Sequence, residues 1–161
     1  MAALRDKTCC FTGHRDIDPR ETQRIEQSAE TAVLCLYEKG VRFFGVGGAI
    51  GFDTMMAEML FRLRETKLPD IKVILVYPFD GFTNRWSDAQ KARYAALLPK
   101  YDKVVRVCEK PGRDAYLARD RHLVDGSAYC IAYCTRDTGG TAYTIHYAKQ
   151  KGLDVQSIIT M

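Results

Sequence analysis

Residues 45–53 read Gly45-Val46-Gly47-Gly48-Ala49-Ile50-Gly51-Phe52-Asp53. A strand-like run over 41–44 precedes this stretch. After it, Met55, Met59 and Leu63 recur with the spacing of a helical stripe. A strand, a glycine-rich turn and a helix form the repeating unit of parallel α/β sheets. The stretch therefore predicts a strand-to-helix turn in a fold of that class.

The glycines of this loop have two interpretations. Backbone N–H groups without side chains, placed at the positive end of a helix dipole, favour the floor of a phosphate or carboxylate site. The alternative is a tight turn with close backbone packing and no ligand. The spacing matches neither the dinucleotide fingerprint, because Ile50 stands where a third glycine belongs, nor the P-loop.

The rest of the chain alternates strand-like and helix-like segments. Strands are expected at 7–12, 41–46, 72–77, 103–108, 128–134 and 153–159. Helices are expected from 19 to about 39 with Asp18 as N-cap, from about 53 to 68, and over 87–98, 114–125 and 141–152. Six strands alternating with five helices predict a single Rossmann-like, doubly wound α/β domain over 1–161, with a mainly parallel sheet and helices on both faces.

Three suggestive turns all follow predicted strands. They are Gly13-His14-Arg15, the glycine loop 45–51 and Thr138-Gly139-Gly140-Thr141. In doubly wound sheets, ligands bind outside the carboxyl ends of the strands, near the point where strand order reverses. All three turns lie on that edge, and we therefore expect them to form a single site.

Each polar residue in the turns has a functional and a structural interpretation. Arg15 suits a charge-assisted contact to an anion, or is a solvated surface arginine. His14 is a donor, an acid or base, or a hydrogen-bonded turn residue. Thr138 or Thr141 caps the last helix or donates to a phosphate oxygen.

Helical segments add further candidates. Asp53 is expected to be the N-cap of its helix, or to accept hydrogen bonds from a sugar hydroxyl. Glu58 lies four residues before Arg62, which favours an exposed helix ion pair. The charge run that contains Arg119 suits a solvated face.

The aromatic residues Phe79, Phe82 and Trp86 follow the third strand. They stack on a base in one interpretation. In the other they anchor the next helix or form part of a dimer contact.

The composition of the 161 residues limits the class of protein. Apolar residues make up 47% and charged residues 27%, as in soluble globular proteins. The net charge of +4 is too small to indicate nucleic acid by itself. The six cysteines lack disulfide or zinc spacing, so we expect reduced, mostly buried thiols and no metal. We also expect no cofactor. Residues 1–7 resemble neither a signal peptide nor a membrane span, and we expect a cytoplasmic protein without membrane contact.

Four motifs follow one another along nearly the whole chain. They are Thr12-Gly13-His14-Arg15, then 47–53 with Ala57-Glu58, then 119–125, and Gly139-Gly140-Thr141. Together they resemble the YpsA-like branch of the SLOG superfamily. That superfamily also contains the LOG-type cytokinin-activating phosphoribohydrolases and the Rossmann domain of the DNA-processing protein DprA.

The resemblance implies a Rossmann-like fold that binds a nucleotide or nucleotide-derived ligand and senses or processes it. Dimers are frequent in the superfamily, so we expect a homodimer. The implied ligand-binding residues are Gly13, His14, Arg15, Gly47, Gly48, Ala49, Gly51, Asp53, Arg119, Thr138, Gly139, Gly140 and Thr141.

A catalytic role is implied less directly. LOG enzymes carry a proline-glycine-glycine loop, a glutamate shortly into the following helix, and an arginine. Here Val46 precedes Gly47-Gly48, and Glu58 is the nearest glutamate after the loop. Cleavage of an N-glycosidic bond requires a carboxylate near the ribose, for which Glu58 and Asp53 are the candidates.

Three functions are therefore under consideration. The first is a cytosolic sensor or processing module for a small nucleotide-type ligand. The second is an enzyme that cleaves the base–ribose bond of a nucleoside monophosphate. The third is a nucleic-acid-processing module of the DprA kind, which the mild charge and the lack of a basic stripe disfavour.

Overall fold

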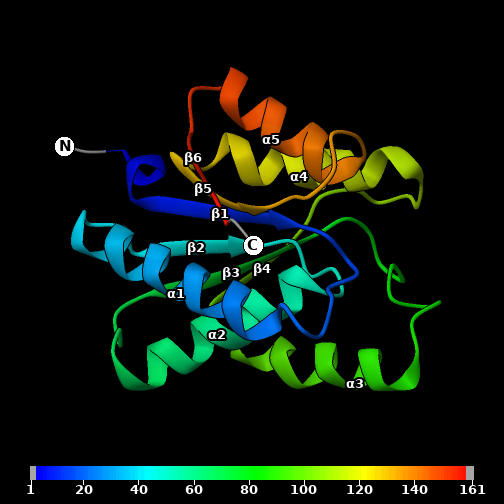
Figure 1. The fold of residues 1–161 in the computed structure, drawn as a ribbon. Helices are drawn as coiled ribbons and strands as arrows, with labels where there is room; N and C mark the ends of the chain where they lie inside the picture. Colours follow the sequence, from blue (N-terminus) through cyan, green and yellow to red (C-terminus); the bar gives the residue numbers. More distant parts are fainter. Residues whose placement is uncertain (1–2, 159–161) are drawn as a thin grey trace.

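A computed structural model describes residues 3–158 and has one six-stranded parallel sheet (Figure 1). The strands are β1 (Thr8–Gly13), β2 (Phe43–Val46), β3 (Lys72–Tyr77), β4 (Lys103–Arg106), β5 (Tyr129–Tyr133) and β6 (Asp154–Ser157). The helices are α1 (Thr22–Glu38), α2 (Phe52–Thr66), α3 (Asp88–Leu97), α4 (Arg113–Asp125) and α5 (Gly140–Gln150), with short 3-10 turns η1 (Leu4–Lys7) and η2 (Leu98–Lys100). The predicted α/β fold class is confirmed. The predicted end of the last strand at Ile159 lies outside the described residues.

The strand order is β4-β3-β2-β1-β5-β6. The chain builds outward from β1 to β4 and then returns through α4 to place β5 on the other side of β1. In the β1–β5 ladder, Cys10 lies opposite Cys130 and Gly13 lies opposite Tyr133. Strand order thus reverses between β1 and β5, which is where ligands bind in sheets of this kind.

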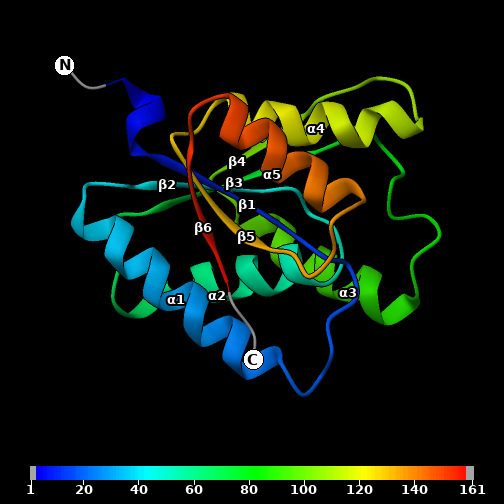
Figure 2. The ribbon, with the colours of Figure 1, turned by 45° about the horizontal axis from the view of Figure 1, so that its top comes forward.

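The helices cover both faces of the sheet. Helices α1, α2 and α3 lie on one face and α4 and α5 on the other (Figures 1 and 2). β3 shows why the strands are apolar without alternation, because Val73 and Leu75 join the core beneath α1 and α2, while Val76 joins the core beneath α4 and α5. Both cores bury apolar area, the main favourable contribution to folding.

The start of α1 differs from the prediction. The helix begins at Thr22, and its N-cap, Glu21, forms no side-chain cap bond. Asp18 instead holds a turn ahead of the helix, where its carboxylate accepts the Arg20 N–H and its carbonyl accepts the Glu21 N–H. Asp18 can satisfy its acceptors locally in this way, and the helix then starts one turn later.

The start of α2 also requires a correction. Its N-cap is Gly51, at φ +78°, and Asp53 lies inside the first helical turn. The Asp53 carboxylate accepts the N–H of Ala49, four residues earlier. Asp53 therefore braces the glycine loop and does not cap the helix.

Candidate binding site at the strand-order switch point

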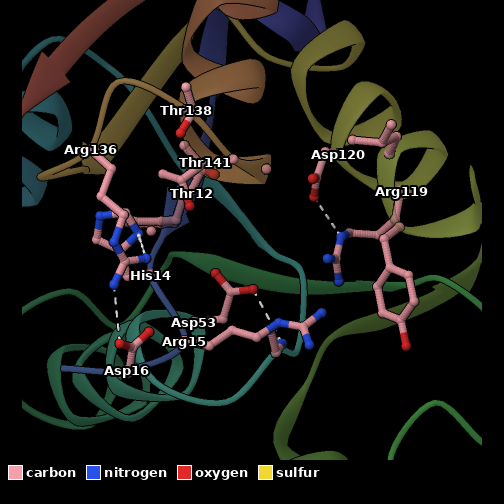
Figure 3. A pocket seen from close by; sticks show the side chains of 17 residues that line it. Thr12, His14, Arg15, Asp16, Asp53, Arg119, Asp120, Arg136, Thr138 and Thr141 are labelled. Atoms are coloured by element: carbon pink, nitrogen blue, oxygen red, sulfur yellow. Dashed lines mark hydrogen bonds and ion pairs between the residues drawn. The ribbon is translucent and has the colours of Figure 1, made fainter. Parts of the chain in front are cut away.

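A pocket of about 330 Å³ lies at the switch point between β1 and β5. Its walls come from 13–16 after β1, Ala49 and Asp53 around the start of α2, 116–120 of α4, and the connection from β5 to α5. The structure thus brings parts of all three predicted turns to one pocket. Figure 3 shows its polar side chains, with His14 and Arg136 on one side, Arg119 and Asp120 on the other.

His14 links the two strands that flank the pocket. Its imidazole is buried, and Nε2 accepts the backbone N–H of Thr135 at 2.8 Å. Because a backbone amide can only donate, Nε2 is unprotonated and the neutral ring carries its proton on Nδ1. Burial, followed by the charge of Arg136, lowers the pKa of His14, and Asp16 opposes this shift. The ring is therefore a fixed structural acceptor at neutral pH, in keeping with a hydrogen-bonded turn residue.

Two arginines reach the pocket from the loops after β1 and β5. Arg136 pairs with Asp16 at 3.1 Å. Arg15 forms no ion pair with a carboxylate anywhere in 3–158, and its guanidinium instead lies 5.1 Å from the ring centroid of Tyr116. Figure 3 shows Arg15 extending beside Asp53. Arg15 is thus the pocket cation most available to an incoming anion.

Arg119 lies inside the protein, which corrects the expectation of a solvated charge run. It is only 5% exposed, donates to the carbonyl of Gly47 at 2.6 Å and pairs with Asp120 at 2.6 Å. Asp120 also accepts the hydroxyl of Thr144 on α5. Arg119 therefore ties α4 to the glycine loop, and its own charge is already compensated.

Asp53 is the buried acid of the pocket, with 8% of its surface exposed. Burial raises its pKa from 3.8 to about 6, and the neighbouring charge of Asp120 adds to this shift. Arg119, the Ala49 N–H and Arg15 oppose it. A desolvated carboxyl group with a perturbed pKa inside a cleft is a common mark of a functional site.

The glycine loop itself serves close packing. A Cβ on Gly47 would lie 2.9 Å from the Asp53 carboxylate, one on Gly48 would lie 2.8 Å from Leu75, and one on Gly51 would lie 2.1 Å from the Arg15 carbonyl oxygen. Of the candidate ligand-binding residues at 47–51, only Ala49 lines the pocket. The expected cradle of exposed glycine N–H groups is therefore filled by protein atoms, as the structural interpretation of the turn requires.

The N-terminus of α5 is the open helix end. Gly139 and Gly140 line the pocket, and no atom lies within 4 Å of the position of a Cβ on either residue. The N–H of Tyr143 bonds to the Gly139 carbonyl, so the N–H groups of 140–142 precede the helical ladder. The N-cap, Gly139, forms no side-chain cap bond, and Thr138 and Thr141 line the pocket instead of capping. These features are the ones that suit a helix end to an anion.

Comparison with known proteins places this geometry in a family. The model of the YspA SLOG family, named YpsA, matches residues 9–161. The chain belongs to the YspA SLOG family. The resemblance to the YpsA-like branch is thereby confirmed.

Relatives of this YspA SLOG chain carry the name UPF0398. The protein of Halalkalibacterium halodurans is 26% identical over 130 residues, which cover 79% of this chain and 68% of that protein. UPF0398 protein YpsA of Bacillus subtilis is 20% identical over 155 residues, with 90% of this chain and 86% of that protein covered.

Two solved structures share the fold. DprA of Streptococcus pneumoniae aligns with a TM-score of 0.71 at 19% identity, covering 98% of this chain and 52% of that chain. DprA of Helicobacter pylori aligns with a TM-score of 0.69 at 18% identity, covering 98% of this chain and 68% of that chain. The chain thus spans about half the length of the pneumococcal protein, and the similarity concerns the fold.

Glu58, the other candidate carboxylate of this YspA SLOG chain, lies outside the switch-point pocket. Its predicted ion pair with Arg62 is wrong, because Glu58 pairs with Arg93 of α3 and Arg62 pairs with Glu26 of α1. Both residues form ion pairs with neighbouring helices and not with each other, because α2 packs between α1 and α3. Glu58 lines a neighbouring pocket.

The aromatic connection after β3 anchors α3. Phe82 contacts Tyr77, Trp86 and Tyr94, with ring centroids 5.4 to 5.9 Å apart, and Phe79 packs on Tyr116. None of Phe79, Phe82 and Trp86 lines the switch-point pocket. The anchoring interpretation of this segment therefore matches the structure.

Sequence reasoning missed three residues that shape the pocket. Arg136 and Tyr116 line it, and Asp16 pairs with Arg136. Arg136 carried a usable signal, because it lies between β5 and the glycine pair that opens α5. Tyr116 carried none, since its position depends on how α4 packs across the sheet.

Proposed function

We propose that this protein binds a nucleotide through its phosphate groups in the switch-point pocket. The observation that carries the proposal is the open N-terminus of α5, which shares the pocket with Arg15, an arginine that forms no ion pair with a carboxylate in the described chain. Backbone donors at a helix end and an available guanidinium are the groups that recognise phosphate. The pocket volume of about 330 Å³ suits a small ligand.

The relatives support this class of ligand without naming one. The structure from Helicobacter pylori is described by its single-stranded DNA binding mode. We carry over only the nucleotide character of that ligand, because the net charge of +4 is mild for a protein that binds nucleic acid. A nucleic-acid partner remains the less favoured alternative, and the homodimer and the cytoplasmic location remain predictions.

Isothermal titration calorimetry with ADP, AMP and adenosine tests the proposal. We expect ADP and AMP to bind at least tenfold more tightly than adenosine, because a charge-assisted hydrogen bond contributes about 1.5–3 kcal/mol. Arg15→Ala should weaken ADP binding about tenfold by the same reasoning. Arg20→Ala is the matched control, because Arg20 is exposed and pairs with Asp18 outside the pocket. Equal affinity for adenosine and ADP would contradict the proposal.

Hydrolysis of the base–ribose bond is the second candidate function. It rests on Asp53, a buried carboxyl group in the pocket whose pKa is raised to about 6. Release of adenine from AMP, followed by chromatography, tests this function. We expect Asp53→Asn to abolish release, and Glu58→Gln to leave it unchanged because Glu58 lies outside the pocket. If wild-type protein releases no base, the protein is a binding module.

A further inference from the structure

A second pocket of about 360 Å³ lies beside the first. It is formed by the segment before α1, the first turns of α1, the first half of α2 and the first turns of α3, and Glu58 and Arg93 line it. Arg15 is the one residue that lines both pockets. The two pockets thus adjoin each other at Arg15, the residue to which we assign phosphate.

Consecutive residues of the glycine loop line the two pockets. Ala49 lines the first pocket, while Ile50 and Gly51 line the second. At this point the backbone around Arg15 crosses the glycine loop so closely that a Cβ on Gly51 would lie 2.1 Å from the Arg15 carbonyl oxygen, and the Phe52 N–H bonds to the carbonyl of the preceding residue at 3.0 Å. These two backbone segments therefore cross where residues of the two pockets meet.

The second pocket combines apolar walls with a polar end. Ile17, Ile50 and Met55 line it, and their side chains suit the faces of a flat ring. At the polar end, Gln90 uses its side-chain oxygen to accept the Ser87 N–H, which leaves its amide NH₂ to donate. The Glu58–Arg93 pair adds an acceptor and donors beside it. This arrangement matches the faces and the hydrogen-bonding edge of a nucleobase.

We propose that the ligand consists of two nucleosides joined through phosphates, with one nucleoside in each pocket and the phosphates passing Arg15. This inference rests on the proposed function, because it uses the same phosphate contacts. The open end of α5 and Arg15 provide two anion contacts, and the two pockets provide two ring sites. A mononucleotide fills only the first half of this arrangement.

Calorimetry with three probes tests the inference on the wild-type protein. The probes are adenosine, ADP and diadenosine diphosphate, in which two adenosines are joined 5′ to 5′ through two phosphates. We expect diadenosine diphosphate to bind about tenfold more tightly than ADP, because the second base is buried against the apolar walls of the second pocket. ADP controls for the two phosphates, because it lacks only the second nucleoside.

Variants place the gain in the second pocket. Ile17 is half-buried and lines the second pocket but not the first, so Ile17→Trp should fill the second pocket alone. This variant should lose the tenfold tighter binding of diadenosine diphosphate and keep its affinity for ADP. Leu98→Trp is the matched control, because Leu98 is 39% exposed and lines neither pocket. Arg93→Ala removes an exposed side chain at low risk to folding and should reduce the gain about threefold.

The outcomes separate this inference from the proposed function. Tighter binding of diadenosine diphosphate that is lost in Ile17→Trp and kept in Leu98→Trp supports the inference. ADP binding without any gain from the second adenosine overturns it and leaves the proposed function standing. A gain that survives both Ile17→Trp and Arg93→Ala also overturns it, because the second base then lies elsewhere. ADP binding no tighter than that of adenosine overturns both.

Discussion

At the scale of single residues, the raised pKa of Asp53 makes the stability of the folded protein depend on pH. In the folded protein its pKa is about 6, above the ordinary value of 3.8 that we take for the unfolded chain. The folded state therefore binds the Asp53 proton more tightly than the unfolded state does. The stability that this difference supplies is fully present below pH 3.8 and is lost as pH rises to 6.

The pH dependence of unfolding tests this account. Relative to Asp53→Asn, the free energy of unfolding of the wild type should fall by about 2 kcal/mol between pH 4 and pH 7. Urea denaturation at several pH values measures the difference. Asp18→Asn is the opposite control, because the hydrogen bonds from Arg20 hold the pKa of Asp18 below its ordinary value. A slope of the same sign in both comparisons would contradict the assignment to Asp53.

The sequence predicted which loops form the pocket, but it did not predict which side chains contact each other there. Arg15, Gly139 and Gly140 were assigned to one site because they follow strands, and the structure brings them to one pocket. The charge run around Arg119 suits a solvated face, while the family resemblance implies that Arg119 binds ligand, and nothing in the run itself marks the residue that points inward. Its burial depends on a carbonyl 72 positions away, on Gly47.

At the scale of elements, the turn between β2 and α2 contributes residues to both pockets. Gly51 adopts φ +78°, and no other residue type fits there without displacing the Arg15 backbone. The same turn starts α2 and presents Ala49 and Asp53 to the switch-point pocket. Stability and site geometry are therefore coupled in this element.

Substitution of two glycines separates backbone strain from steric contact. Gly51→Ala should reduce the free energy of unfolding by about 3–4 kcal/mol, because it combines the cost of positive φ with a clash against backbone atoms. Gly152→Ala is the control, since Gly152 has φ +83° and open space around its Cβ position. It should cost only about 1–2 kcal/mol. Equal costs in urea denaturation would show that packing around Gly51 is loose.

The pattern of apolar residues predicted the strands, because burial on both faces makes the inner strands continuously apolar. β3 was predicted over the same residues that it occupies, 72–77. Helix starts were less predictable, because Asp18 and Asp53 satisfy their acceptors with nearby backbone groups in a way that local sequence does not distinguish from capping. Ion pairs between helices, such as Glu58 with Arg93, depend on packing that no spacing rule contains.

At the scale of the whole molecule, the parallel sheet followed from the alternation of elements, but the strand order did not. The order β4-β3-β2-β1-β5-β6 depends on the side to which the chain returns after β4. Sequence patterns contain no signal for that choice, because the inner strands on both sides of β1 are equally apolar. The single domain over 1–161 stays a prediction.

Cooperative unfolding tests the single domain. Trp86 is the only tryptophan and packs with Phe82 and Tyr94 on the α3 side of the sheet. We expect its fluorescence and the far-UV circular dichroism to show the same urea midpoint, as in two-state unfolding. A Trp86→Phe/Tyr147→Trp variant moves the reporter to α5, on the other face. Different midpoints for the two reporters would indicate separate units.

The bond between His14 and Thr135 joins groups 121 positions apart, and α5 follows only after it. Ribosomes release a chain from its N-terminus, so the first wall of the pocket leaves the exit tunnel long before the helix end that faces it. During translation the proposed binding site therefore stays incomplete until β5 and the start of α5 have emerged. A ligand at that site would stabilise only chains in which these elements have already folded.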